Sequence, residues 1–235
     1  MSLWADILER LESLRLDLRK RFRPENPTSH VDFSIALIAL SAKLAKADGH
    51  VSRSEVSMFR QIMDIPPEEE ARVGRIYNLC RQETAGFEAY ATRVHRLIRG
   101  HEEEAMIREN LLDGLFHIAM ADGEYHPNED RFLRITADRL GLDEAGFERI
   151  MARHVPDAWD PYEVLGVSRQ AGLSEIRAAR NTLVKAHHPD RLAAAGLPEE
   201  MRKISEDRIR QINRAYDVLR LSAEKGKDAD SSPCI

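Results

Sequence analysis

The chain has 235 residues, of which 43% are hydrophobic and 6% aromatic, and its formal net charge is −5 at pH 7. This composition is typical of a globular protein with one large or two small domains. Acidic residues outnumber basic ones by 22 to 16 in residues 31–155, and thirteen of each balance in 156–235, so no basic face of the kind that binds nucleic acid is expected.

Residues 1–30 are predicted to form an amphipathic helix over 3–22, followed by a linker that contains Pro24 and Pro27. Apolar side chains at helical spacing make one stripe, and basic side chains gather towards the end: Trp4, Ile7, Leu8, Leu11, Leu14 and Leu18, then Arg15, Arg19, Lys20, Arg21 and Arg23. Three roles remain open for this helix. It can dock on the protein's own core, contact a membrane surface peripherally, or mediate self-association.

Residues 31–153 are predicted to form a helical domain, because apolar residues recur at helical spacing and no strand-like alternation is present. Glycines and the Pro66-Pro67 pair separate the expected helices. Their approximate ranges are 31–47, 52–64, 67–82, 86–98, 103–120, 127–140 and 143–153.

This region contains an internal repeat. Ala47-Asp48-Gly49 recurs as Ala121-Asp122-Gly123, and in each copy a glutamate, Glu55 or Glu129, follows seven residues after the aspartate. The paired pattern in an all-helical domain resembles the TerB (tellurite-resistance) domain.

Two interpretations of the four carboxylates remain open. Asp48, Glu55, Asp122 and Glu129 could together bind Ca²⁺ or Mg²⁺, which prefer oxygen ligands, and TerB domains are associated with metal. Alternatively, both glutamates cap helices. Ser52-Arg53-Ser54-Glu55 has the pattern of a capping box, and Pro127 at the first helical position places Glu129 where it can cap.

Residues 160–222 are predicted to form a helical hairpin around His188-Pro189-Asp190. Helix-forming runs cover 173–187 and 199 to about 221, and Pro189 requires the first of them to end before it. The flanking sequences are specific in order and spacing: Asp160-Pro161-Tyr162-Glu163-Val164-Leu165-Gly166-Val167 before the first run, and Gln211-Ile212-Asn213-Arg214-Ala215-Tyr216 within the second. The segment resembles the J domain of DnaJ co-chaperones. Its loop sequence is similar to that of DjlA-type J proteins, in which a TerB-like domain precedes a C-terminal J domain.

This resemblance implies a co-chaperone that binds a DnaK-type chaperone through His188, Pro189 and Asp190 and stimulates its ATPase. A basic helix face implied to meet the acidic chaperone surface comprises Arg177, Arg180, Lys185 and Arg191. The face departs from the common pattern, since Arg180 replaces an aromatic residue, Asn181 and Thr182 replace basic ones, and His187 replaces a tyrosine. The alternative is that these basic side chains only keep the helix surface solvated and bind no partner. The TerB-like domain is expected to be an adaptor or regulatory module, with an unknown client or target.

No nucleophile or phosphate-binding motif is present, so no enzymatic activity is expected. Two cysteines, Cys80 and Cys234, and the lack of a signal peptide or spanning segment favour a cytoplasmic location, although DjlA-type proteins are usually anchored in a membrane. Residues 223–235 are expected to be a flexible tail. The rival functions are a metal-responsive stress sensor, with the J domain as its output, and a scaffold.

Overall fold

The computed structural model describes residues 30–47, 53–63, 65, 67, 70–81, 86–100, 103–194 and 199–230. Within these ranges every regular element is helical, which confirms the predicted all-α fold class. The predicted helix at 3–22 lies outside the described residues, as do Asp48 and Cys234.

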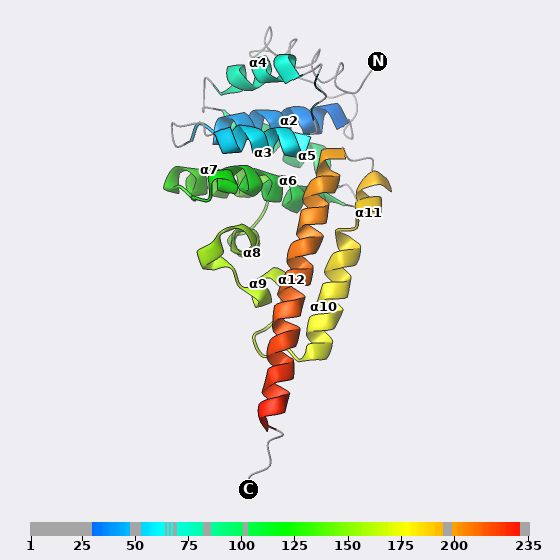
Figure 1. Cartoon of the computed structure of the whole chain (residues 1–235). Helices are drawn as coiled ribbons and strands as arrows, with labels where there is room; N and C mark the ends of the chain where they lie inside the picture. The colour runs from blue at the N-terminus through cyan, green and yellow to red at the C-terminus, as the bar shows by residue number, and fades with distance from the viewer. Residues whose placement is uncertain are drawn as a thin grey trace.

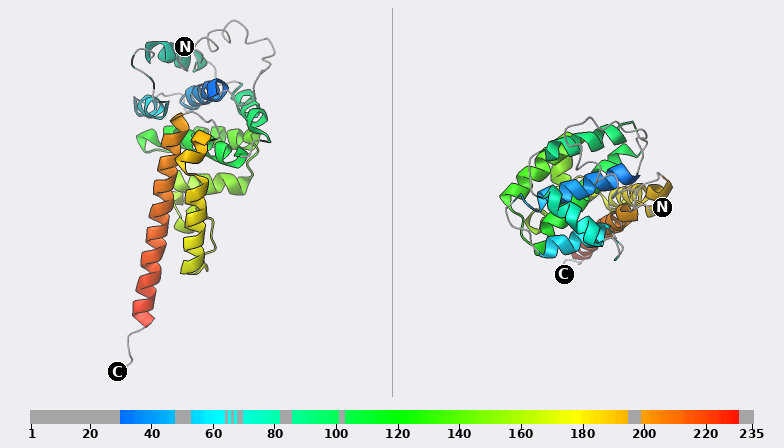
Figure 2. Two further views of the ribbon diagram at one scale, coloured as in Figure 1. Left: turned by 90° about the vertical axis from the view of Figure 1, so that its right-hand side faces the viewer. Right: turned by 90° about the horizontal axis from the view of Figure 1, so that it is seen from above.

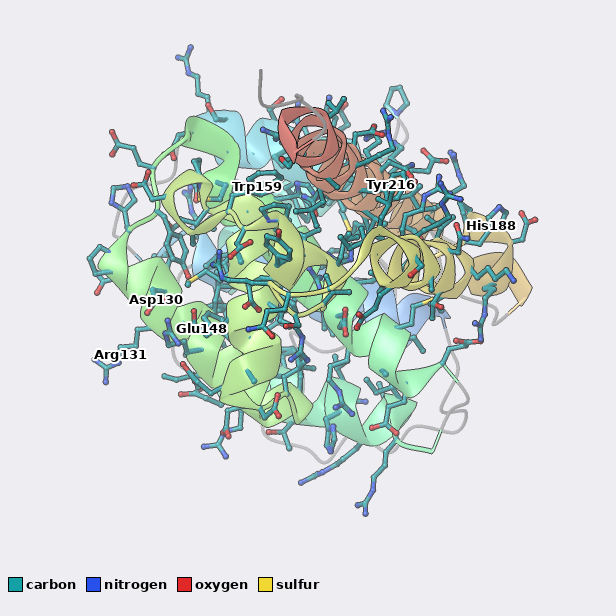
Figure 3. The ribbon with its side chains drawn as sticks, turned by 90° about the horizontal axis from the view of Figure 1, so that it is seen from below. Asp130, Arg131, Glu148, Trp159, His188 and Tyr216 are labelled. Atoms are coloured by element: carbon teal, nitrogen blue, oxygen red, sulfur yellow. The ribbon has the colours of Figure 1, made fainter. Side chains whose placement is uncertain are left out.

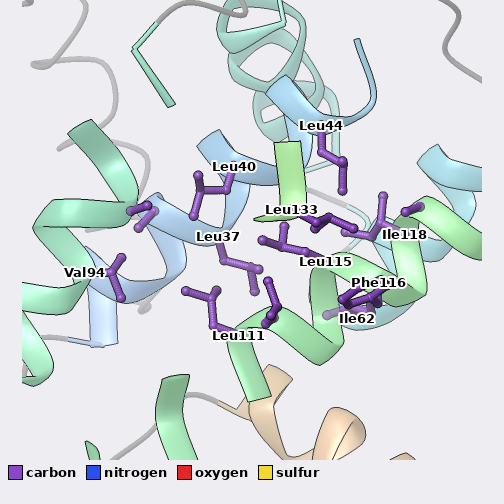
Figure 4. Packing of buried hydrophobic residues seen from close by; sticks show 14 of the residues in the cluster. Leu37, Leu40, Leu44, Ile62, Val94, Leu111, Leu115, Phe116, Ile118 and Leu133 are labelled. Carbon is purple, nitrogen blue, oxygen red and sulfur yellow. The ribbon is translucent and has the colours of Figure 1, made fainter. Parts of the chain in front are cut away.

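Two helices that are apolar on nearly every side form the centre of the first domain. They are α2 (His30–Leu44), buried from Ala36 onwards, and α6 (Glu104–Ala119). A helix with apolar residues on all sides must be enclosed by other helices. The enclosing helices are α3 (Arg53–Met63), α4 (Glu70–Cys80), α5 (Phe87–Ile98), α7 (Pro127–Leu140) and α8 (Glu144–His154), as Figure 1 shows. In the core, Leu37 and Leu40 of α2 lie near Leu111 and Leu115 of α6 (Figure 4).

The second domain is an antiparallel hairpin of α10 (Leu173–Ala186) and α12 (Glu199–Asp230), with the five-residue helix α9 (Pro161–Leu165) against it (Figure 1). Its smaller core contains Val164, Leu165, Ile176, Ile212, Ala215 and Leu219. A 3₁₀ turn, η2 (Pro156–Ala158), joins this domain to α8. The two domains therefore have separate apolar cores and a short connection.

Local sequence signals determine where several helices begin. Pro127 is the first residue of α7, as predicted. The side chain of Asp143 accepts a hydrogen bond from Gly146 N at 2.8 Å at the start of α8. At the start of α9, Asp160 does the same with Tyr162 N at 2.9 Å. Each aspartate satisfies a backbone donor that has no partner within the helix.

The N-terminal part of α12 also packs into the first domain. Ile204 is 1% exposed and belongs to the core of that domain. It lies against Gly114 of α6, where a Cβ would come within 2.8 Å of Ile204 Cδ1. Lys203 Nζ donates to the carbonyl oxygen of Gln61 at 2.9 Å. A side chain at position 114 would therefore require the Ile204 side chain to shift, and glycine leaves room for it.

The structure differs from the predicted helices in two places. A short helix, α11 (Pro189–Ala194), occupies part of the expected loop, because proline fits the first position of a helix. In addition, α12 continues to Asp230 and runs past α10 (Figure 2), through most of the segment expected as a tail. Five of the eight residues in 223–230 are alanine, glutamate or lysine, which favour helix.

Candidate functional site

The tripeptide His188-Pro189-Asp190, which we call the HPD loop, lies where α10 gives way to α11, and Pro189 and Asp190 are the first two residues of α11. Asp190 N donates a hydrogen bond to His188 Nδ1 at 3.2 Å, and Asp190 Oδ2 lies 3.4 Å from the same nitrogen. The side chain of His188 is 50% exposed and that of Asp190 is 90% exposed. Figure 3 places His188 at the periphery of the molecule, beyond the end of α10. The loop therefore presents a carboxylate to solvent beside an imidazole that contacts its backbone.

The residue before the loop is buried and attached to the opposite helix. His187 is 4% exposed, and its backbone N donates to Leu183 O at 2.9 Å, which closes α10. Its carbonyl oxygen accepts a hydrogen bond from Ser205 Oγ of α12, and Ser205 is fully buried. A carbonyl at a helix end has no partner within the helix, so this hydroxyl satisfies it.

The predicted basic residues do not all lie in the same setting. Arg177 and Lys185 of α10 are exposed. Arg180 binds Asn213 Oδ1 of α12 through Nε at 3.0 Å and Nη2 at 2.8 Å. Its guanidinium also lies 5.7 Å from the centre of the Tyr216 ring. Arg180 thus joins α10 to α12, a structural role that we did not predict.

Arg191, the cation that follows the loop, contacts the first domain. Its guanidinium forms an ion pair with Glu103, which precedes α6. The Arg191 side chain remains 46% exposed, whereas that of Glu103 is 14% exposed. The pair places an acidic residue of the first domain next to the HPD loop.

A buried polar cluster that we did not predict lies near the junction of the domains. Arg153 Nη1 of α8 lies 3.2 Å from both carboxylate oxygens of Asp113, which is on α6. His154 Nε2 lies 2.8 Å from Asp113 Oδ1, and Glu109 accepts from Arg153 Nη2 at 3.2 Å. The only sequence signal for this cluster is the presence of Asp113 within the apolar run of α6.

Burial and ion pairing shift the pKa values of this cluster in opposite directions. Burial raises the pKa of Asp113, but the Arg153 guanidinium and the hydrogen bond with His154 hold it well below its usual range. Burial lowers the pKa of His154 to about 4, although Asp113 opposes this. Burial, together with the charge of Arg208, also lowers the pKa of His187 to about 4. Both histidines are therefore neutral in the folded protein near pH 7.

We expect the folded protein to lose stability as the pH falls from about 6.5 towards 4. In this window the unfolded chain binds protons at His154 and His187 whereas the folded chain does not, so protonation favours unfolding. The cost approaches about 1.4 kcal/mol per pH unit for each histidine. Asp113 adds to the loss only as the pH approaches 3.8, the ordinary pKa of aspartate in the unfolded chain, at the lower edge of this window. Urea unfolding at pH 7, 6 and 5 measures the slope. His187→Phe should flatten it, whereas a stability independent of pH would contradict the prediction.

The four carboxylates predicted as alternative metal ligands are not all described. Glu129 Oε2 accepts from His126 N at 3.0 Å, which is the predicted capping contact, and Asp122 Oδ1 accepts from Glu124 N at 3.1 Å. Glu55 is buried in α3, and Asp48 lies outside the described residues. Within the described ranges, no group of three or more histidine, cysteine or acidic side chains could hold a metal ion. The Ca²⁺ or Mg²⁺ site stays a prediction. A titration with Ca²⁺ or Mg²⁺ that does not raise the melting temperature would exclude it.

Family comparisons match both domains. Residues 34–152 match the family model "Tellurite resistance protein TerB", and residues 160–227 match the model "DnaJ domain". Similar curated proteins include "Co-chaperone protein DjlA" of Photobacterium profundum, 28% identical over 87% of this chain and 82% of the relative. The DjlA protein of Vibrio cholerae is 26% identical over 86% of this chain and 81% of the relative. The DjlA protein of Escherichia coli K12 is also 26% identical, over 75% of this chain and 74% of the relative. No solved structure matches. Among the described residues, no helix is long and apolar enough to cross a membrane.

Proposed function

Since the chain belongs to the TerB family through residues 34–152 and carries a DnaJ domain after it, in the order of the DjlA co-chaperones, we propose that it is a co-chaperone of a DnaK-type chaperone. The HPD loop docks on the ATPase domain of that chaperone and stimulates ATP hydrolysis. The protein supplies a docking surface, and the chaperone performs the chemistry.

The exposed carboxylate of Asp190 is the observation that carries this proposal. Its side chain is 90% exposed at the start of α11, and His187, which precedes the HPD loop, is buried, so the charge is presented from a fixed support. A carboxylate in this setting can accept charge-assisted hydrogen bonds from an arginine of the partner. Arg177 and Lys185 are exposed on α10 and add attraction to an acidic partner surface.

Steady-state ATP hydrolysis by a DnaK-type chaperone, with and without this protein, tests the proposal. The expected result is a saturable increase in the rate as the protein is added. Binding without an increase in rate would support the rival view that the protein is a scaffold.

The first domain acts as a regulatory module in this proposal, because Glu103 competes with the chaperone for Arg191. Their ion pair occupies one cation next to the HPD loop. An ion pair with a partly exposed arginine is worth about 0–1 kcal/mol, so a partner can displace it. The client or target that the domain would recruit has no candidate among the described surfaces.

We expect Glu103→Gln to strengthen docking. The half-maximal concentration for ATPase stimulation should fall by roughly two- to fivefold, because Arg191 is released and one repelling charge is removed. The maximal rate should not change. Glu104→Gln is a matched control, since Glu104 pairs with Arg108 of its own helix. An unchanged or higher half-maximal concentration for Glu103→Gln would rule out the competition.

We also propose a cytoplasmic location with at most peripheral membrane contact through the basic residues of 1–30. Contacts of this kind are weakened by salt. After cell fractionation, the protein should appear in the soluble fraction or be released from membranes by high salt. Release by detergent only would contradict this location.

A further inference from the structure

The position of the HPD loop depends on α12, because α12 holds the residue that precedes the loop. Ser205 Oγ donates to the carbonyl oxygen of His187, and both side chains are buried. Pro189 prevents α10 from continuing, so the carbonyl of His187 has no partner within that helix. A shift of Ser205 would therefore move His187, and with it His188 and Asp190.

The first domain holds α12 at the residue next to Ser205. Ile204 is 1% exposed in the core of the first domain and lies against Gly114 of α6. One turn further along α12, Arg208 is 2% exposed and lies 3.9 Å from the carboxylate of Glu109, also on α6. Packed cores resist continuous deformation, so this segment of α12 keeps a defined position relative to α6.

We infer that Ile204 and Ser205 are positioning residues through which the first domain sets the place of the HPD loop. Ile204 connects α12 to the core of the first domain, and Ser205 connects α12 to the loop. Their exposures of 1% and 0% mean that neither can touch a chaperone directly. They act through His187.

This arrangement should control the maximal rate of stimulation more than the affinity of docking. The exposed cations Arg177 and Lys185 belong to α10 and contribute to docking without the loop. Asp190, in contrast, must reach one position on the partner, and a displacement of about 1 Å in such a group can cost up to about 100-fold in rate. The inference rests on the proposed function for this readout.

The test uses the full chain and two pairs of matched variants. Ser205→Ala removes the hydroxyl that holds His187, whereas Ser41→Ala removes an equally buried hydroxyl of α2 that has no hydrogen-bond partner among the described residues. Ile204→Ala removes the contact with Gly114, whereas Ile38→Ala opens a similar space in the same core, on α2. We expect Ser205→Ala and Ile204→Ala each to lower the maximal ATPase rate by at least about threefold, with the half-maximal concentration changed less than twofold.

A second readout does not involve the chaperone. The ring signals of His188 in NMR spectra report its contact with the backbone of Asp190. Ser205→Ala and Ile204→Ala should shift these signals, and the two control variants should not. If the parent protein fails to stimulate any chaperone, the proposed function is wrong, but the NMR comparison still tests the positioning.

The double variant separates one connected path from two independent effects. If Ile204 acts through Ser205, the double variant should lower the maximal rate no further than the more severe single variant. The inference is overturned if Ser205→Ala leaves the His188 signals unchanged. It is also overturned if Ile204→Ala behaves like Ile38→Ala in both readouts, since the effect would then be general loss of packing.

Discussion

Replacing Asp190 with asparagine is expected to abolish ATPase stimulation and leave the protein folded. The substitution removes the charge with little change in volume. The Asp190 side chain is 90% exposed, and the hydrogen bond within the loop uses its backbone N, so folding does not depend on the carboxylate. An uncharged amide cannot replace a carboxylate that faces an arginine, because charge-assisted hydrogen bonds are roughly twice as strong as neutral ones.

The control for this variant is Asp217→Asn. Asp217 is exposed on α12 of the same domain, 62% by its side chain, and pairs loosely with Arg220 at 3.9 Å. Asp217→Asn removes the same charge as Asp190→Asn, so an effect of net charge alone would appear in both variants. If Asp190→Asn accelerates hydrolysis as well as the parent does, the role assigned to the HPD loop is wrong.

Replacing Asp113 with asparagine is expected to destabilise the protein by about 3–5 kcal/mol, as is typical when one partner of a buried ion pair is removed. The side chain of Asp113 is 2% exposed and that of Arg153 is 3% exposed. Asparagine leaves the buried guanidinium with Glu109 as its remaining acidic partner at 3.2 Å. The substitution also removes the carboxylate that contacts His154. Urea unfolding at pH 7 measures the change in the free energy of unfolding.

Asp138→Asn is the control for Asp113→Asn, because Asp138 is exposed on α7. Surface substitutions usually change stability by less than about 0.5 kcal/mol. A loss below about 1 kcal/mol for Asp113→Asn would mean that water replaces the buried pair, and the cluster would not stabilise the junction of the domains.

Short-range signals in the sequence predicted most helices and the loop. Pro189 correctly places the end of α10 before the HPD loop, and Pro127 correctly places the start of α7. These predictions succeed because proline acts through its own backbone and that of the preceding residue. The end of α12 was less predictable, since most of residues 223–230 are types that favour helix and no proline among them marks a boundary.

Contacts between distant residues could not be predicted in this way. Arg191 and Glu103 are 88 positions apart, and Arg153 and Asp113 are 40 apart. Neither pair has a local pattern, because only tertiary packing brings its members together. The contacts of Arg180 are intermediate in how far the sequence predicts them. Its partners Asn213 and Tyr216 are three residues apart on the facing helix, but choosing them requires the register of the hairpin.

Single-turnover hydrolysis of ATP bound to a DnaK-type chaperone, measured with increasing amounts of this protein, tests directly whether the HPD loop stimulates the ATPase. We expect a saturable rise in the rate constant that disappears with Asp190→Asn and persists with Asp217→Asn. A rate constant that does not change at saturating protein, or that rises equally with Asp190→Asn, would contradict it.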